Sequence, residues 1–173
     1  EAQLDRFMLN LWLDYPPFAD EVAVVKATTG AARAALDTVI SAEDLEAYQQ
    51  LVRNAPVADH VVEHAVRLAA ATRPGREGAP DFVTQYLSYG AGPRASQYLV
   101  LGAKAHAAIA GRSAVAIEDV RAVAHPVLRH RIVTNFQAQA EGISSDPLVG
   151  RLIAEVDPRS SVGAGLPGVK QGS

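Results

Sequence analysis

Residues 92–131 read GPRASQYLVLGAKAHAAIAGRSAVAIEDVRAVAHPVLRHR, and this stretch decides the fold class. Its first half is a run of small and apolar residues that opens with Pro93 and is followed by Gly111. Pro is favoured in the first turn of a helix, and Gly directly after its last turn. The pattern therefore predicts a helix over 93–110, in which the alanines and Gly102 allow a neighbouring helix to approach closely.

The chain on either side of this helix is also predicted to be mainly α, as a small helical bundle. Ser41 and Asp44 have the spacing of a capping box, in which each side chain accepts a hydrogen bond from the other residue's backbone N–H, so a helix is expected to begin there. Further helices are predicted at 18–28, 57–72, 118–124 and 127–136, the last two separated by Pro126. A Gly- and Pro-rich loop is expected at 74–92.

One segment near the start of the chain has the pattern of a strand. Residues 7–13 read FMLNLWL and alternate in hydrophobicity, and the polar and Pro residues at 14–17 end the pattern. A strand cannot stand alone, because its backbone groups and its apolar face need partners. We therefore expect the rest of its sheet to lie upstream of Glu1, and the chain to be a fragment of a longer protein.

Composition excludes several classes of protein. The 173 residues carry 16 Lys and Arg against 19 Asp and Glu, a formal net charge of −3 with both signs interspersed. Duplex nucleic acid is not expected as a partner, because its phosphates are normally bound by a concentrated basic face. The absence of cysteine excludes thiolate metal sites and cysteine nucleophiles, and it fits a cytoplasmic protein. No apolar run has the length of a membrane span.

Two motifs carry a resemblance to a known family. Residues 1–7 read EAQLDRF, and residues 92–131 contain GPRAS, AKAHA, GR, EDV and VLRHR in that order, with ATR upstream at 71–73. The first motif resembles the segment before the last strand of the nucleotide-binding α/β core in MoxR-type AAA+ ATPases. The second resembles the helical lid domain of the same family. The resemblance covers residues 1–157.

The resemblance implies a division into three parts. Residues 1–16 would be the end of the nucleotide-binding core, with the arginine-finger segment and the last strand, 17–157 the helical lid domain, and 158–173 a flexible tail. The parent protein would couple hydrolysis of ATP, with Mg²⁺, to remodelling or maturation of client proteins. It would form a homo-oligomeric ring, a hexamer by analogy, and have a partner with a von Willebrand factor A domain.

The resemblance also assigns roles to two arginines. Arg6 matches the arginine finger, which acts in trans on the nucleotide of the neighbouring subunit and accelerates phosphoryl transfer by about 10³- to 10⁵-fold. Arg94 matches the second sensor arginine, which touches the ATP phosphates bound by its own subunit. Independently, Arg94 would place a cation in the first turn of a helix, where the macrodipole disfavours it. Such a broken local rule is more frequent where function requires it.

Four neighbouring or related residues are expected to be structural. Asp5 is expected to orient Arg6, and Phe7 to pack beneath the strand. Arg73 and Arg131 are expected to belong to the scaffold of the lid.

The chain departs from the family pattern at several points. Gly92 stands where the family has Ser, and Ala-Ile stands at 116–117 where it has Thr-Pro, and each lost cap costs about 1 kcal/mol or less. No GxxxxGK[ST] loop and no apolar strand ending in Asp-Glu occurs in the sequence. ATP and Mg²⁺ would therefore be bound mainly by the missing core, and the chain alone is not expected to hydrolyse ATP.

Two alternative functions remain open at this point. His60, Glu63 and His64 form an HxxEH pattern on a predicted helix, which is the ligand spacing of a zinc-dependent hydrolase. A solvated helix face explains the same residues more simply, and no metal site is expected. The other alternative is a non-enzymatic helical adaptor, whose groove between Ala-rich helices would hold a partner helix.

Overall fold

The structure, a computed structural model, describes residues 3–30 and 36–156 of the chain. The chain divides into two compact units, one made of Glu1–Asn10 together with Val52–Ser173 and the other of Leu11–Leu51. The predicted flexible tail lies outside the described residues. Within the described ranges, no helix has both the length and the apolar character that crossing a membrane requires.

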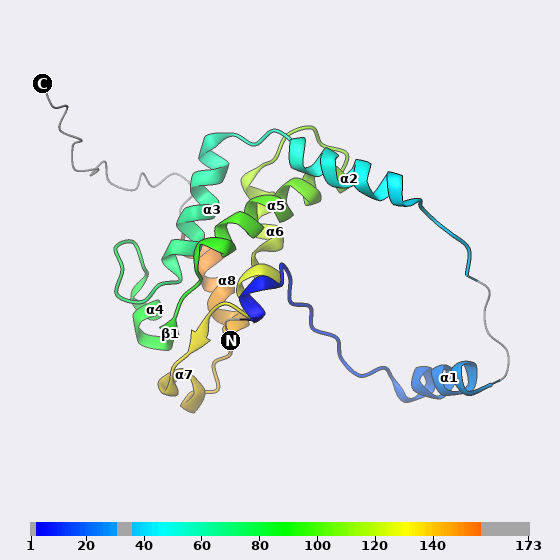
Figure 1. The fold of residues 1–173 in the computed structure, drawn as a ribbon. Coiled ribbons are helices and arrows are strands. Elements are labelled where there is room, and N and C mark those ends of the chain that lie inside the picture. Colours follow the sequence, from blue (N-terminus) through cyan, green and yellow to red (C-terminus); the bar gives the residue numbers. More distant parts are fainter. Residues whose placement is uncertain (1–2, 31–35, 157–173) are drawn as a thin grey trace, which may run out of the picture. The chain divides into compact units, whose positions relative to one another are not determined.

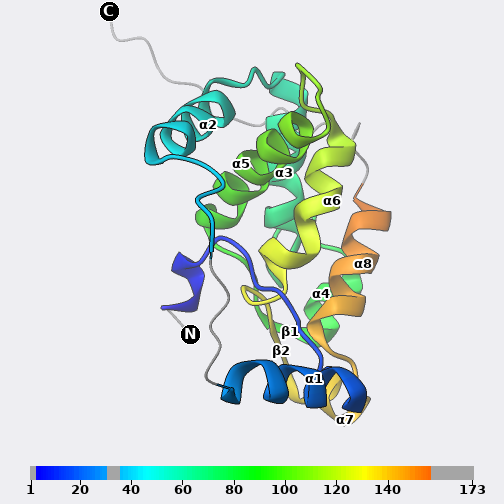
Figure 2. The ribbon, with the colours of Figure 1, turned by 90° about the vertical axis from the view of Figure 1, so that its right-hand side faces the viewer.

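The larger unit is a helical bundle. It is built from α3 (Asp59–Ala71), α5 (Pro93–Ile109), α6 (Ile117–Leu128) and α8 (Ser145–Glu155). Helix α5 packs against both α3 and α6, and α8 packs against α6 and α3 (Figure 1, Figure 2). The core between them contains fully buried branched side chains, among them Val61, Leu68, Leu99, Val120, Leu128 and Leu152. The mainly α bundle predicted from the sequence is confirmed.

Small residues bring α5 close to its neighbours. Ala95, Ala103 and Ala107 are buried on this helix. A methyl group added at Gly102 would lie 3.2 Å from Cγ2 of Val123 on α6, which is closer than ordinary van der Waals contact. The predicted helix and its close approach to a neighbouring helix are therefore confirmed, and the neighbour at Gly102 is α6.

Helix α6 is longer than the sequence pattern predicts. We expected Pro126 to separate runs at 118–124 and 127–136, but Pro126 lies inside α6, which ends at Leu128. Pro126 removes one backbone donor from the last turn, while Val127 and Leu128 continue the fully buried face of the helix. Packing outweighs the missing hydrogen bond, and the helix predicted over 127–136 is wrong.

A small two-stranded sheet lies beside the bundle. After α6 the chain forms β2 (Val133–Thr134) and α7 (Phe136–Ala140). Strand β2 pairs antiparallel with β1 (Leu87–Tyr89), which directly follows the short helix α4 (Asp81–Tyr86). The loop predicted at 74–92 is therefore wrong over α4 and β1. This segment is ordered because it contributes three side chains to the core, those of Phe82, Val83 and Leu87.

Gly90 follows β1 where the backbone passes the end of α3. A methyl group at Gly90 would lie 2.3 Å from the carbonyl oxygen of Thr72, which no side chain can accommodate. Thr72 is buried, and its Oγ1 accepts a hydrogen bond of 2.8 Å from the N–H of Ala91. The same hydroxyl donates to the carbonyl of Ala69 at 2.7 Å. This close contact fixes the chain just before α5 begins.

Asp119 connects the end of α5 to the start of α6. Its carboxylate is buried, and Oδ2 accepts hydrogen bonds from the N–H of Ala116 at 2.8 Å and from Nη1 of Arg112 at 2.7 Å. Oδ1 lies 2.6 Å from Nδ1 of His106 and also contacts Arg112. The Arg112 guanidinium holds the pKa of Asp119 well below its usual range. Asp119 thus accepts the hydrogen bond of the Ala116 N–H at the start of α6, where Ala-Ile stands in place of the Thr-Pro of the family pattern.

The smaller unit contains α1 (Phe18–Thr29) and most of α2 (Ala42–Asn54). The capping box predicted before α2 is confirmed, because Ser41 N–H donates to Asp44 Oδ2 at 3.1 Å and Asp44 N–H donates to Ser41 Oγ at 3.0 Å. The hydrogen bonds from Ser41 lower the pKa of Asp44. Neither helix has a buried residue among those described.

The strand predicted at 7–13 is not formed. The chain near the N-terminus instead makes a single 3₁₀ turn, η1 (Leu4–Arg6), and continues without regular structure to Pro17. In the described part of the chain, β1 and β2 pair only with each other, so no strand edge is paired with 7–13. Asn10 N–H donates to the carbonyl of Pro126 at 2.8 Å, which attaches this segment to α6.

Candidate functional site

Arg94 lies in the first turn of α5. Gly92 precedes the helix in an extended conformation and provides no side-chain cap. The Arg94 side chain is 49% exposed, and its Nη1 lies 3.0 Å from Oδ2 of Asp5 in the N-terminal turn. A residue near the beginning of the chain therefore pairs with the arginine to which the family resemblance gives a nucleotide-binding role.

The second oxygen of the same carboxylate contacts another arginine. Asp5 Oδ1 accepts a hydrogen bond of 3.1 Å from Nε of Arg131, whose side chain is only 1% exposed. Burial lowers the pKa of Arg131, and the negative charge of Asp5 opposes this shift. Asp5 thus joins one half-exposed guanidinium, that of Arg94, to one buried guanidinium.

Arg131 holds the backbone of the N-terminal segment. Its Nη2 donates to the carbonyls of Asp5 at 2.9 Å and Phe7 at 2.5 Å, and its Nη1 donates to Met8 at 3.3 Å. Nη1 also contacts the carbonyl of Val127 within α6. A single buried cation therefore attaches residues 5–8 to the end of α6.

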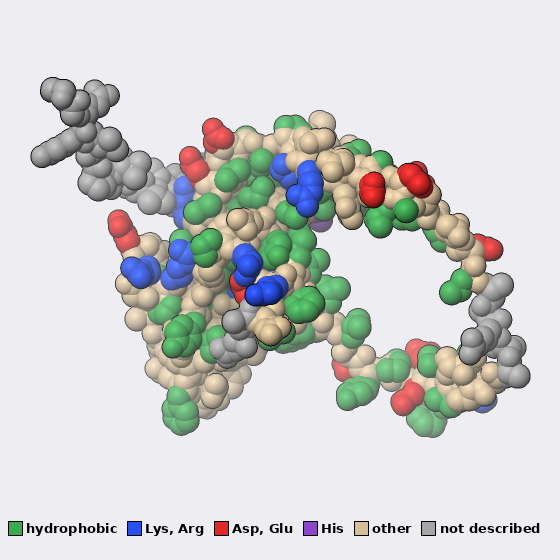
Figure 3. All heavy atoms as spheres, in the orientation of Figure 1, with side chains coloured by type: hydrophobic (Ala, Val, Ile, Leu, Met, Phe, Trp, Pro, Cys, Tyr) green, Lys and Arg blue, Asp and Glu red, His purple; other side chains and the backbone are tan. Residues whose placement is uncertain are grey.

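Arg6 is held through its backbone and exposes its side chain. The Tyr98 hydroxyl donates to the Arg6 carbonyl at 3.0 Å. The Arg131 guanidinium carbon lies 5.0 Å from the centre of the Tyr98 ring. Next to this contact, Nε2 of His130 donates to the carbonyl of Phe7 at 3.1 Å, and burial lowers the pKa of this histidine. Basic side chains gather on this face of the larger unit (Figure 3).

The structure places Arg94 next to the segment that carries Arg6. Arg94 pairs with the side chain of Asp5, and Arg6 is the next residue in the chain. Tyr98, which holds the Arg6 backbone, lies four residues after Arg94 and so on the same face of α5. We call Asp5, Arg6, Arg94, Tyr98 and Arg131 the arginine cluster.

The expectations for the two residues next to Arg6 are wrong. Asp5 does not orient Arg6 through its side chain, since its two oxygens contact Arg94 and Arg131. Phe7 is 65% exposed and does not pack beneath a strand. The scaffold role of Arg131 agrees with its burial and its contacts. Tyr98 was missed, because its spacing of four residues from Arg94 indicates a shared helix face but not its contact with Arg6.

Arg73 also has a scaffold contact. Its Nε donates to the carbonyl of Ala91 at 2.9 Å, near the close approach of Gly90 and Thr72. The residue therefore supports the segment that leads into α5 and Arg94.

The zinc candidates do not form one open site. His60 is exposed, whereas His64 is 1% exposed and lies in the core of the bundle. Glu63 is exposed and lies 4.0 Å from Arg67. Among the described residues, no group of three His, Cys, Asp or Glu side chains is placed to hold a metal ion.

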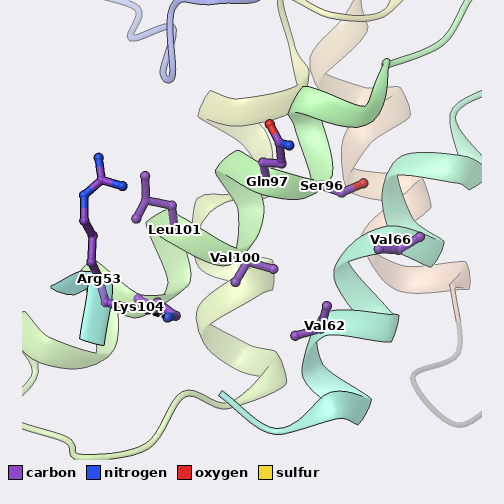
Figure 4. Close-up of a pocket in the computed structure, with 8 residues that line it drawn as sticks. All are labelled: Arg53, Val62, Val66, Ser96, Gln97, Val100, Leu101 and Lys104. Carbon is purple, nitrogen blue, oxygen red and sulfur yellow. Dashed lines mark hydrogen bonds between the residues drawn. The ribbon is translucent and has the colours of Figure 1, made fainter. Parts of the chain in front are cut away.

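A groove of about 510 Å³ lies between α3 and α5, separate from the arginine cluster. Figure 4 shows Val62 and Val66 projecting from α3 and Val100 and Leu101 from α5. Lys104 at one end of the groove donates to the carbonyl of Arg53 at 2.9 Å. The lining is mostly apolar.

The arginine cluster presents guanidinium groups, which are suited to binding phosphate oxygens. A guanidinium presents several donors in a plane and binds phosphate oxygens in pairs. Arg94 is half-exposed and Arg6 is exposed, so each side chain is accessible from solvent. The positive end of the helix dipole at the start of α5 would also favour an anion.

Comparisons with known proteins agree with this fold. A model of the AAA lid domain family matches residues 81–152. The chain is 31% identical over 156 residues to Chaperone MoxR1 of Mycobacterium tuberculosis, covering 90% of this chain and 41% of that protein. It is 30% identical over 157 residues to the uncharacterized protein YeaC of Bacillus subtilis, covering 90% of this chain and 46% of that protein.

A solved structure is also similar. The crystal structure of a candidate ATPase from Cytophaga hutchinsonii superposes with a TM-score of 0.78 at 30% identity, covering 90% of this chain and 48% of that one. The chain thus spans less than half the length of each of these relatives. The fold, the family model and the two kinds of match support a MoxR-type AAA+ C-terminal portion, with an AAA lid domain over residues 81–152.

Proposed function

We propose that this chain is the lid and arginine-finger portion of an AAA+ ATPase that couples ATP binding and hydrolysis to remodelling or maturation of client proteins. The observation that carries the proposal is the arginine cluster. It holds Arg94, the match to the sensor arginine, beside the segment that presents Arg6, the match to the arginine finger. The relative named a chaperone supports the assignment to client proteins.

Arg94 is proposed to bind the phosphates of the nucleotide held by its own subunit. Because Arg94 lies at the start of α5, binding of its guanidinium to phosphate would attach this end of the helix to the nucleotide. Helix α5 packs against α3 and α6, so the bundle would follow as a nearly rigid body. The lid would then close over bound nucleotide and open after its release.

Arg6 is proposed to act on the nucleotide of the neighbouring subunit. Its carbonyl is bonded to Tyr98, and the carbonyls on both sides of it, those of Asp5 and Phe7, are bonded to Arg131. The backbone is thus fixed while the side chain extends into solvent. A fixed backbone places the guanidinium for transition-state stabilisation, because less conformational freedom is lost when the neighbouring subunit arrives.

The remaining parts of the proposal come from the family resemblance. ATP and Mg²⁺ would be held mainly by a nucleotide-binding core, where the metal ion neutralises charge on the transferring phosphoryl group. The complete protein would assemble as a ring, a hexamer by analogy, in the cytoplasm. A partner with a von Willebrand factor A domain belongs to the same analogy. The chain alone, without the core, is expected to be inactive.

Two substitutions in the complete protein test the proposal. Arg6→Ala should leave the dissociation constant for ATP within about two-fold and lower kcat by about 10³-fold or more, because the finger acts on the transition state. Arg94→Ala should both weaken ATP binding and lower kcat. Arg151→Ala, which removes a half-exposed arginine of α8 paired with Glu155, is the matched control. Unchanged turnover in Arg6→Ala, or unchanged affinity in Arg94→Ala, removes that residue from its role.

A further inference from the structure

Asp5 divides its carboxylate between two arginines that differ in exposure and in the number of their contacts. Arg131 is 1% exposed and is bonded to carbonyls of both the N-terminal segment and α6. Arg94 is 49% exposed and contacts Asp5 through one nitrogen at 3.0 Å. If one of the two ion pairs opens, it is therefore the pair between Asp5 and Arg94.

We propose that Asp5 is a positioning residue that holds Arg94 away from the nucleotide until phosphate displaces the carboxylate. The inference rests on the proposed function, since it takes Arg94 as a ligand of the ATP phosphates. It adds a competition between two anions, one in the chain and one in the ligand, for the same guanidinium.

Phosphate oxygens are the stronger competitor for this guanidinium. A carboxylate that contacts one guanidinium nitrogen makes one charge-assisted hydrogen bond, whereas a phosphate can accept two parallel bonds from the fork of Arg94. Asp5 keeps its bond to Arg131 when Arg94 leaves, so its negative charge is not left unpaired. Exchange of Arg94 from carboxylate to phosphate is therefore favourable, but the lost ion pair reduces the apparent affinity for nucleotide.

Release of Arg94 from Asp5 also changes the charge next to Arg6. Asp5 is the residue before Arg6, and Arg131 holds both the Asp5 side chain and the Asp5 carbonyl. Departure of Arg94 removes one of the two arginines from the Asp5 carboxylate while the backbone anchor at Arg131 remains. The charge balance next to Arg6 thus changes with the state of the subunit's own nucleotide, which links the two sites through Asp5.

Equilibrium binding of ADP and of a non-hydrolysable ATP analogue to the complete protein tests the inference. Asp5→Asn removes the negative charge and keeps an oxygen that accepts a hydrogen bond from Arg131. Because an ion pair this exposed contributes modestly, we expect the dissociation constant of the analogue to fall by about 2- to 5-fold. In the Arg94→Ala background, Asp5→Asn should leave the dissociation constant unchanged.

Two further variants separate positioning from structural effects. Asp5→Glu keeps the charge and should bind nucleotide more like the wild type than Asp5→Asn does. Glu77→Gln removes one exposed carboxylate outside the arginine cluster and controls for net charge, so its affinity should stay at the wild-type value. Melting curves establish that each variant is folded before its affinity is compared.

The outcomes distinguish this inference from the proposed function. If Arg94→Ala weakens binding but Asp5→Asn does not tighten it, the competition is refuted and the sensor role stands. If Asp5→Asn changes affinity equally with and without Arg94, the effect is a general loosening of the segment and the inference is also refuted. If Arg94→Ala does not weaken binding, the sensor role itself fails.

Discussion

Replacing the buried guanidinium of Arg131 should release the segment that carries Arg6 without unfolding the bundle. Arg131→Met keeps a long side chain and removes the hydrogen bonds to the Asp5 carboxylate and to the carbonyls of Asp5, Phe7 and Met8. The released oxygens can bind water once the segment detaches. We therefore assign each of these hydrogen bonds a net contribution of about 0.5 to 1 kcal/mol. Their loss lowers the free energy of docking of the segment by about 2 to 4 kcal/mol.

The effect should be local because several apolar side chains of the segment stay about half-exposed when it is docked. Leu4, Phe7 and Leu9 are 50%, 65% and 43% exposed. The substitution leaves the apolar side chains of the core, such as Leu99 and Leu128, in place, although it removes the contact of Arg131 with the Val127 carbonyl. The melting temperature of the bundle should therefore change little, while the docked state of the segment loses most of its population.

Hydrogen exchange at the Asn10 amide measures this release directly. That amide donates to the carbonyl of Pro126, so it is protected only while the segment is docked. A loss of 2 kcal/mol or more corresponds to exchange faster by about 30-fold or more. Arg151→Met, on α8, is the matched control and should leave this amide unchanged. Unchanged exchange in Arg131→Met would refute the claim that this cation holds the segment.

The fold itself supplies two further predictions. Asp119→Asn should lower the free energy of unfolding at neutral pH by about 2 kcal/mol, measured by urea denaturation, because the carboxylate accepts charge-assisted hydrogen bonds from Arg112. The pKa of Asp119 in the folded state lies below its ordinary value of 3.8, so the carboxylate stabilises the fold above pH 3.8 and this stabilisation is lost as the pH falls further. If Asp119→Asn lost stability in acid as steeply as the wild type, Asp119 would not be the source of this pH dependence. Gly90→Ala should destabilise the fold by about 1 to 3 kcal/mol, because its methyl group would lie 2.3 Å from the Thr72 carbonyl, and an unchanged denaturation midpoint would exclude that close contact.

Local sequence signals predicted the helices whose ends and faces are set locally. The capping box of Ser41 and Asp44 and the Pro93 start of α5 were read correctly, because each depends on residues within one turn. The errors lie where distant contacts decide. Pro126 remains inside α6 because the residues after it are buried, and β1 is a strand because β2, far along the chain, pairs with it.

The candidate site also combines residues that the sequence indicated with contacts that it could not indicate. Arg6 and Arg94 were selected by resemblance to a family motif, and their roles remain predictions. The contacts of the arginine cluster were not predictable from local patterns, since Asp5 meets Arg94 and Arg131 across most of the chain length. Residues 7–13 alternate in hydrophobicity as a strand does, but they pair with no strand in the described residues. Their alternation alone therefore could not determine their conformation.

The central claim is that Arg94 and Arg6 contact nucleotide phosphates from different subunits. A cryo-electron microscopy structure of the assembled, complete protein with a non-hydrolysable ATP analogue tests it most directly. We predict that Arg94 leaves Asp5 and lies within about 2.7 to 3.2 Å of a phosphate oxygen in its own subunit, and that Arg6 approaches the terminal phosphate of the neighbouring subunit. Both side chains facing bulk solvent, away from any subunit interface, would contradict the account.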